Sequence, residues 1–369
     1  MKHRVGIIGC GGIANQKHFP ALTAAANRVE IAYLCDLIPE RCETAKKKYG
    51  LDSAKICTDY HEVTAAADVD VIYVLTPNVA HCEITVAALE GGKHVLCEKP
   101  MAASTADAEK MMAAWEKSGK IFTIGYQNRY RADSQALKRL CDDGELGKIY
   151  YAQAHALRRR GVPTWGVFTD KAKQGGGPLI DIGTHSLDLT LWFMDNYEPQ
   201  TVTGVTFEKL GNSLSPNLQG NPMGNWNENT YDVEDAAFAF VTMKDGSLVT
   251  IDASWVLNHT EERCAATYLC GTVAGAELTG VGGANNHKLY VNKIMGGRQV
   301  DAEVNTSAGG VDFFDGKRVS ATDVECKIFL DAIDGVGELI VKPEQAFAVT
   351  KILDAVYQSA RLGRQIIFD

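Results

Sequence analysis

The stretch RVGIIGCGGIANQKHFPAL occupies residues 4–22 and combines an apolar run with a glycine-rich pattern. Residues 5–8 form a short apolar run of strand length, and residues 9–14, GCGGIA, fit the pattern G-x-G-x-x-A. In this pattern one glycine makes a tight turn, a second lets the backbone approach a pyrophosphate, and a small third residue lets the helix pack on the strand. The free N–H groups at the start of the helix favour anions. The stretch therefore predicts a dinucleotide-binding strand, turn and helix.

An acid ends the next strand-like run, VEIAYLCD at residues 29–36. Asp36 lies 25 residues after Gly11, where an acid accepts hydrogen bonds from the adenosine ribose hydroxyls of a dinucleotide. Its charge would repel a 2'-phosphate, so the sequence favours NAD over NADP, although Arg41 could cover the adenine or tolerate a phosphate. The alternative role for Asp36 is that of a helix cap or a turn acid.

Strand-like and helix-like segments alternate through the first third of the chain. The patterns predict strands within residues 68–78, 93–100 and 120–129, and helices at residues 39–49, 80–92 and 104–117. Such alternation predicts a parallel, doubly wound α/β sheet, whose ligands bind beyond the carboxyl ends of the strands. The residues that we assign to the cofactor lie in or after those ends: Gly9, Gly11, Gly12, Ile13, Asp36, Arg41, Thr76, Pro77, Asn78, His81, Glu98, Lys99 and Gln127.

The sequence CEKP, residues 97–100, places Lys99 at one of these carboxyl ends. Pro100 has a fixed φ and biases the residue before it towards an extended conformation. A lysine held in this way could point across the cofactor site. The alternative is a surface lysine beside Glu98, an arrangement that contributes little to stability.

The pattern changes after about residue 129. Residues 130–149 are typical of a helix that ends in a glycine turn, and residues 347–362 of a closing helix. Strand-like runs without intervening helices lie between them, at residues 150–158, 200–207, 236–243, 247–257 and 264–272, with a shorter candidate at 287–292. This order predicts an α+β domain with antiparallel pairing. We expect a Rossmann domain at residues 1–127 and an α+β domain at residues 128–369.

Two long polar loops, residues 158–178 and 209–235, lie in the second domain. Loops of this length in a compact domain are usually functional or mobile. Trp165 and Trp226 could stack on a sugar face or on a nicotinamide, or they could simply anchor their loops. The second loop could instead belong to an oligomer contact.

Three stretches in this order resemble the family of glucose–fructose oxidoreductase, inositol dehydrogenase and rhizopine-catabolism proteins, Gfo/Idh/MocA. They are GIIGCGGIA, TPNVAHCEITVAALEGGKHVLCEKPMA and GGGPLIDIGTHSLDL, and the resemblance covers essentially the whole chain. It implies a Rossmann domain followed by an α+β domain whose open, mostly antiparallel sheet often serves for oligomerisation. It also implies NAD(P)-dependent oxidation or reduction of a secondary alcohol on a sugar or cyclitol. Lys99 matches the family's E-K-P lysine, and Asp181 and His185 match its D-x-x-x-H pair.

The segment LIDIGTHSLDL, residues 179–189, allows three interpretations. A metal site would need a third ligand, and no H-x-x-E-H, H-E-x-x-H or cysteine cluster supplies one. A solvated helix face conflicts with the surrounding apolar residues. Acid/base catalysis fits best, because histidine titrates near neutrality and can accept the proton of a secondary alcohol. We therefore assign His185 as proton acceptor, Lys99 as the group that stabilises the alkoxide, with these two roles interchangeable, and Asp181 as the orienting acid; Asp188 receives no role.

The stretches RRRGVPTWGVF and GGGPLIDIGTHSLDLTLW resemble the branch of the family that oxidises sugars and glycosides at C3, including levoglucosan, glucosides and C-glucosides. This narrower resemblance implies a 3-keto sugar or glycoside as product. The residues that we assign to the substrate are Lys99, Asn128, Arg158, Trp165, Asp181 and His185. Alternatives are a redox-neutral hydrolase or lyase that retains NAD, a cyclitol dehydrogenase, and a sensor without catalytic activity. The intact Lys99, Asp181 and His185 argue against the sensor.

Composition and charge argue against nucleic-acid-binding and membrane-spanning proteins. The 369 residues carry a formal net charge of -9, and Arg158, Arg159 and Arg160 are too few for a nucleic-acid footprint. No run approaches the length of a membrane span, and the basic first residues lack a long apolar segment after them. The ten cysteines form no C-x-x-C pair. We expect a cytoplasmic enzyme without a structural metal, which acts on a small molecule and forms a homo-oligomer, as a dimer or tetramer.

Overall fold

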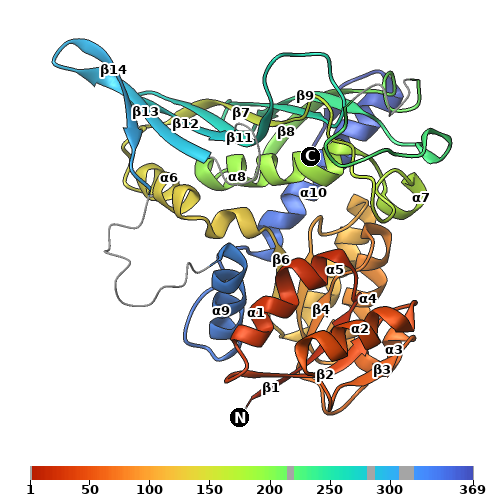
Figure 1. Ribbon diagram of the computed structural model, residues 1–369. Coiled ribbons are helices and arrows are strands. Elements are labelled where there is room, and N and C mark those ends of the chain that lie inside the picture. Colours follow the sequence, from red (N-terminus) through yellow and green to blue (C-terminus); the bar gives the residue numbers. More distant parts are fainter. Residues whose placement is uncertain (1, 214–219, 281–286, 307–319, 369) are drawn as a thin grey trace. The chain divides into compact units, whose positions relative to one another are not determined.

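The computed structural model describes residues 2–213, 220–280, 287–306 and 320–368. The chain forms two compact units (Figure 1). Unit 1 comprises Met1–Tyr130 and Asp315–Phe347, and unit 2 comprises Arg131–Phe314 and Ala348–Asp369. This division differs from the expected domains, residues 1–127 and 128–369, chiefly because a late segment returns to unit 1.

A parallel sheet organises unit 1. Its described strands number six, in the order β3-β2-β1-β4-β5-β6, and all five neighbouring pairs are parallel. They are β1 (His3–Ile8), β2 (Val29–Cys35), β3 (Lys55–Cys57), β4 (Val71–Val74), β5 (His94–Glu98) and β6 (Phe122–Gly125). From β1 the chain continues to β2 and β3 on one side of the sheet, and from β4 it continues to β5 and β6 on the other side. The strand order therefore changes direction between β1 and β4. The predicted doubly wound sheet is confirmed.

Helices follow the strands of unit 1. They are η1 (Ala14–His18), α1 (Phe19–Ala24), α2 (Pro39–Tyr49), α3 (Tyr60–Thr64), η2 (Asn78–Ala80), α4 (His81–Glu90), α5 (Thr105–Ser118) and η3 (Gln127–Tyr130). Because crossovers between parallel strands are right-handed, α1 and α4 lie on opposite faces of the sheet. Residues 5–8 of β1 and all four residues of β4 are buried, as expected for strands covered on both faces.

Helix α9 (Ala321–Ile333) completes unit 1, although it lies late in the sequence. A capping box begins it: the Ser320 side chain accepts from the Asp323 backbone N–H, and the Asp323 side chain accepts from the Ser320 backbone N–H. The ring of Phe329 lies edge-on to Tyr73 of β4, with 5.9 Å between centroids. Arg28 makes ion pairs with Asp331 and Asp334, which tie the end of the helix to the start of β2. These contacts explain why the segment belongs to unit 1.

A second, mostly antiparallel sheet organises unit 2. Its nine described strands have the order β14-β13-β12-β11-β7-β10-β9-β8-β15, and only β7 and β10 among them pair in parallel. They are β7 (Ile149–Leu157), β8 (Pro199–Phe207), β9 (Ala236–Met243), β10 (Leu248–Ser254), β11 (Arg263–Gly271), β12 (Ala274–Gly280), β13 (His287–Met295), β14 (Arg298–Val304) and β15 (Ile366–Ile367). The predicted α+β domain is confirmed, with β12, β14 and β15 as additional strands.

The helices of unit 2 are α6 (Ala132–Asp142), α7 (Lys171–Gln174), η4 (Leu179–Gly183), α8 (Thr184–Met194), η6 (Glu228–Thr230) and α10 (Pro343–Leu362), whose first turn belongs to unit 1. Helix α8 packs on β7 and β11 (Figure 1). Ser186 Oγ donates to the carbonyl oxygen of His155 at 2.6 Å, and the hydroxyls of Thr190 and Thr267 lie 3.2 Å apart. These contacts fix the helix that carries His185 on the sheet. Within the described residues, no helix has both the length and the apolar character needed to cross a bilayer.

Candidate active site

The glycine turn after β1 has one structural glycine and two open ones. Gly9 has φ +97°, and a Cβ there would lie 2.5 Å from the carbonyl oxygen of Leu75, so only glycine fits. At Gly11 and Gly12, by contrast, no described atom lies within 4 Å of the Cβ position. The backbone on this side of the turn is therefore accessible to a ligand. Such a turn fits the pyrophosphate of a dinucleotide, as the sequence predicts.

Asp36 holds the same turn from the end of β2. Its Oδ2 accepts from the backbone N–H of Cys10, and its Oδ1 accepts from that of Ile38, both at 2.9 Å. Arg41 Nη1 lies 3.5 Å from Oδ1, and the Asp36 residue is 8% exposed. Asp36 is thus a turn acid as well as a candidate ligand for ribose. The Arg41 side chain is half exposed beside it.

Two polar atoms near the carboxyl ends of β4 and β6 are buried without a partner. Thr76 Oγ1 and Gln127 Oε1 have no hydrogen-bond partner among the described residues. Buried polar atoms in proteins are normally hydrogen-bonded, so these two are the atoms that a bound polar ligand would satisfy. Their position at the predicted cofactor site, with the open glycines, fits a dinucleotide.

His81, the first residue of α4, contacts the segments that follow β4 and β5. It is completely buried, with Nε2 2.9 Å from the carbonyl oxygen of Thr76 and Nδ1 2.8 Å from that of Pro100. Burial lowers the pKa of His81, so the neutral ring donates to one of these oxygens. The residue connects the loops after β4 and β5. Pro77 is exposed and Asn78 is half-buried.

The Glu98 carboxylate contacts two side chains of η1, the helical turn that follows the glycines. Its carboxylate lies 2.8 Å from His18 Nε2 and 3.7 Å from Lys17 Nζ, and it accepts from the Lys99 backbone N–H at 3.1 Å. Burial by itself would raise the pKa of Glu98, but Lys17 and His18 outweigh it and hold the pKa well below its usual range. The ionised carboxylate therefore fixes the backbone of Lys99, whose own side chain is half-buried. The Lys99–Pro100 peptide bond is cis.

Asp181 and His185 lie on a helix that changes type between them. Asp181 belongs to the π-helical turn η4, and His185 to the first turn of α8. Turns of the π type occur frequently at functional sites. Asp181 is 8% exposed, and its Oδ2 accepts from Trp255 Nε1 at 3.2 Å, while His185 is half-buried. Asp188, one turn further, is fully buried.

The two tryptophans of the polar loops differ in exposure. Trp226 is buried, and its Nε1 donates to the carbonyl oxygen of Gly211 at 2.6 Å, so it anchors its loop. Trp165 is 53% exposed and meets Phe168 edge-on at 6.1 Å, which leaves a ring face available for stacking. Arg158 Nη1 donates to the carbonyl oxygen of Gly161 at 3.0 Å. Asn128 lies half-buried in η3.

The residues predicted for catalysis and for substrate binding belong to both units. Lys99 and Asn128 are in unit 1, whereas Arg158, Trp165 and the Asp181–His185 pair are in unit 2. Their joint action on one substrate stays a prediction. In the described ranges, no group of three His, Cys, Asp or Glu side chains could hold a metal ion.

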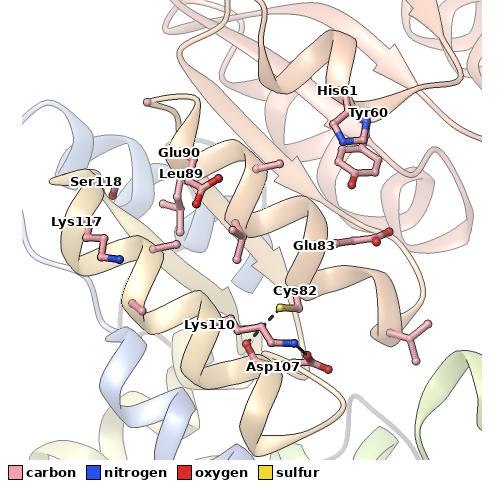
Figure 2. A pocket seen from close by; sticks show the side chains of 16 residues that line it. Tyr60, His61, Cys82, Glu83, Leu89, Glu90, Asp107, Lys110, Lys117 and Ser118 are labelled. Atoms are coloured by element: carbon pink, nitrogen blue, oxygen red, sulfur yellow. Dashed lines mark hydrogen bonds and ion pairs between the residues drawn. The ribbon is translucent and has the colours of Figure 1, made fainter.

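A hollow of about 1050 Å³ lies along the outer sides of α4 and α5 in unit 1. Figure 2 shows its polar lining, in which Lys110 Nζ lies 2.7 Å from Asp107 Oδ1 and Cys82 Sγ donates to the Asp107 carbonyl oxygen at 3.3 Å. The predicted site residues, all of them described, do not line this hollow. It is therefore separate from the residues to which we assign chemistry.

Comparison with known protein families identifies both halves of the chain. Residues 3–126 match the oxidoreductase family with an NAD-binding Rossmann fold, and residues 134–275 match the GFO/IDH/MocA C-terminal domain. The chain belongs to the Gfo/Idh/MocA family of oxidoreductases. The family resemblance predicted from the sequence is confirmed, and so is the prediction that the protein is an enzyme.

Members of the Gfo/Idh/MocA family that resemble this chain are named sugar and cyclitol dehydrogenases. D-glucoside 3-dehydrogenase of Escherichia coli (strain K12) is 33% identical over 98% of this chain and 97% of its own length. Inositol 2-dehydrogenase of Salmonella typhimurium (strain LT2) is 31% identical over 53% of this chain and 55% of its own length. Levoglucosan dehydrogenase, solved with NADH and levoglucosan, has a TM-score of 0.80 and 18% identity over 100% of this chain and 99% of that one. This last likeness bears on the fold alone.

Several residues that support the family's motif residues were not predicted from the sequence. Lys17 and His18 hold Glu98, and Trp255 holds Asp181. Glu234 and Tyr357 hold the loop before Asp181. The sequence offers one local signal, and it concerns Glu234. The acidic dipeptide Glu234-Asp235 stands directly before an apolar strand, where acids are expected to be buried and therefore hydrogen-bonded.

Proposed function

We propose that this Gfo/Idh/MocA enzyme uses NAD to oxidise a secondary alcohol of a pyranose sugar or glycoside, at C3, to the 3-keto product. The observation that carries the proposal is the Asp181–His185 pair. A buried acid held by Trp255 lies one helical turn before a half-buried imidazole. The nearly full-length similarity to a D-glucoside 3-dehydrogenase supports the substrate class and the carbon.

His185, Lys99 and Asp181 have different roles in the proposed alcohol oxidation. Bound NAD would accept the hydride from the carbinol carbon. His185 takes the hydroxyl proton, and the Lys99 ammonium stabilises the negative charge that develops on that oxygen. Lys99 and His185 can exchange these roles. Asp181, anchored by Trp255 Nε1, orients the substrate hydroxyls or the imidazole.

We also propose that NAD is preferred over NADP. The Asp36 carboxylate lies at the end of β2, where a 2'-phosphate would bring a second negative charge close to it. Arg41 offsets this charge only in part, because its side chain is half exposed and therefore screened.

The proposed oligomer uses one face of the nine-stranded sheet. Register places Val205 and Phe207 of β8 on the same face as Phe240 of β9, and these side chains are 47%, 40% and 60% exposed. Neighbouring exposed apolar side chains on a sheet face are typical of association surfaces. We propose that a second copy of the chain covers them.

The activity is tested with a panel of glucosides, free sugars and inositol, each with NAD and with NADP, by absorbance of the reduced cofactor. We expect reduced NAD from glucosides, and a loss of at least about a hundredfold in kcat for Lys99→Met and His185→Ala. Variants that process substrate like the parent would show that these residues are not catalytic.

Two other functions give different results in the same assay. Similarity to inositol 2-dehydrogenase favours a cyclitol dehydrogenase as the second candidate, and inositol would then be the preferred substrate. A redox-neutral hydrolase or lyase would release the aglycone without accumulating NADH. Either outcome would replace the main proposal.

A further inference from the structure

Glu234 is a buried carboxylate outside the proposed chemistry. It is 4% exposed and lies two residues before β9. Its Oε2 accepts from the backbone N–H of Gly177 at 2.8 Å. Its Oε1 accepts from the backbone N–H of Leu179 at 3.2 Å and from the hydroxyl of Tyr357, on α10, at 2.8 Å. One side chain therefore joins the loop before Asp181 to a helix that lies far along the sequence.

The triple glycine before Asp181 fits closely around these two side chains. A Cβ at Gly176 would lie 2.1 Å from Tyr357 Oη, and one at Gly177 would lie 2.2 Å from the backbone oxygen of Glu234. Gly175 has φ +82°, which ends α7 in the left-handed region. The glycines are therefore required for the loop to reach Glu234 and Tyr357, and these two residues set its position.

The position of this loop determines the position of the Asp181 backbone. Leu179 begins η4, and the Asp181 backbone N–H donates to the carbonyl oxygen of Gly177 at 3.0 Å. On the other side, the Asp235 carbonyl oxygen accepts from the Trp255 backbone N–H at 3.0 Å, and Trp255 Nε1 binds the Asp181 carboxylate. The neighbouring residues Glu234 and Asp235 thus support both the backbone and the side chain of Asp181.

We propose that Glu234 and Tyr357 are positioning residues, which hold Asp181 and His185 in the orientation that alcohol oxidation needs. The inference rests on the proposed function. Misplacement of catalytic groups by about 1 Å can reduce rates by about a hundredfold. A carboxylate with three donors, two of them from the segment that leads into Asp181, is suited to prevent such displacement.

Tyr357→Phe tests the inference most cleanly, because it removes one hydroxyl and adds no atom near Gly176. We expect kcat to fall by about tenfold or more, with KM changed by less than about threefold. We also expect hydrogen exchange at the Gly177 and Leu179 amides to accelerate. Glu234→Gln keeps one carbonyl acceptor and should lose less kcat than Glu234→Ala, as partial rescue by a conservative variant.

Two control variants separate positioning from general loss of stability. Ser359→Ala, on the same helix α10, removes a buried hydroxyl that donates to the Arg364 carbonyl oxygen and accepts from the Gly204 N–H. Tyr290→Phe removes an exposed Tyr–Glu hydrogen bond on β13. Both should keep the kcat of the parent, and Ser359→Ala should do so despite a lower Tm.

The outcomes distinguish the inference from the proposed function. A parent enzyme that oxidises no sugar, glycoside or cyclitol would contradict the proposed function. Three results would overturn the inference itself: Tyr357→Phe with the kcat of the parent, unchanged exchange at Gly177 and Leu179, or an equal loss of kcat in Ser359→Ala.

Discussion

Buried carboxyl groups in this enzyme differ in their partners, and the difference decides their charge. Glu98 has His18 and Lys17 close by and is held ionised. Glu325 on α9 is 1% exposed, and its Oε1 has no hydrogen-bond partner among the described residues. Burial, together with the nearby charge of Glu98, raises the pKa of Glu325 to about 8. The same residue type is therefore an anion in one place and a neutral acid in the other.

Because of the Glu325 proton, the free energy of unfolding decreases as pH rises. The folded chain keeps the Glu325 proton up to about pH 8, whereas the unfolded chain loses it near pH 4.5. Between these values the folded state binds more protons, so its free energy of unfolding decreases with increasing pH. Glu325→Gln stays neutral, and we expect it to exceed the parent in stability at pH 8.5 by on the order of 2–4 kcal/mol, with the gain shrinking towards pH 5. Thermal melts against pH, with exposed Glu338→Gln as control, check this; a gain independent of pH would contradict it.

Asp36 determines cofactor preference if its charge faces the ribose. Asp36→Asn removes the charge but keeps the shape and one of the two acceptors for the Cys10 and Ile38 amides. We expect the ratio of kcat/KM for NADP to that for NAD to rise at least about tenfold, since about 1.4 kcal/mol of repulsion is removed. Steady-state kinetics with both cofactors measure the ratio, and exposed Asp52→Asn serves as control. An unchanged ratio would mean that Asp36 acts only as a turn acid.

Among the elements of unit 1, the turn after β1 contains one glycine that close backbone contacts require and another beside open space. Gly9 meets the Leu75 backbone, whereas the space above Gly11 is open. Gly9→Ala should therefore cost roughly 2 kcal/mol or more of stability, while Gly11→Ala should leave the Tm nearly unchanged. Gly11→Ala should instead weaken NAD binding about tenfold or more, because the new Cβ occupies the space left for the pyrophosphate. Calorimetry and NAD titration of both variants measure these effects. NAD binding by Gly11→Ala as tight as that of the parent, or a Gly9→Ala variant as stable as the parent, would contradict the prediction.

Local patterns in the sequence predicted most elements of unit 1, because alternating apolar runs and glycine turns specify strands and their exits. The patterns did not place α9, since its partners Arg28 and Tyr73 lie hundreds of residues earlier in the chain. They predicted a helix at Asp181 and His185 but not the π-type turn, which packs against β10, a strand far along the chain. The burial of Trp226 depends on residues distant in the sequence, such as Val162 and Trp255, with which it shares a cluster.

At the scale of the whole molecule, each unit has its own sheet, and unit 2 leaves apolar side chains on one sheet face. If a second copy covers that face, Phe240→Lys should shift the protein towards the 40.0 kDa monomer, because a buried unpaired charge is costly. Sedimentation velocity checks the mass, with Val336→Lys, at an exposed apolar position in unit 1, as control. A parent that is already monomeric, or a Phe240→Lys variant that remains associated, would contradict the proposed interface.

The residues that we propose for the chemistry come from both units, with Lys99 in unit 1 and Asp181 and His185 in unit 2. We propose that these residues promote oxidation of a glycoside at C3 by hydride transfer to NAD. A methyl glucoside deuterated only at C3 tests this step, with NMR and mass analysis of the cofactor and the sugar. We expect deuterium in the reduced nicotinamide and a 3-keto glycoside as product. Reduced cofactor without deuterium, or deuterium retained in the sugar, would contradict it.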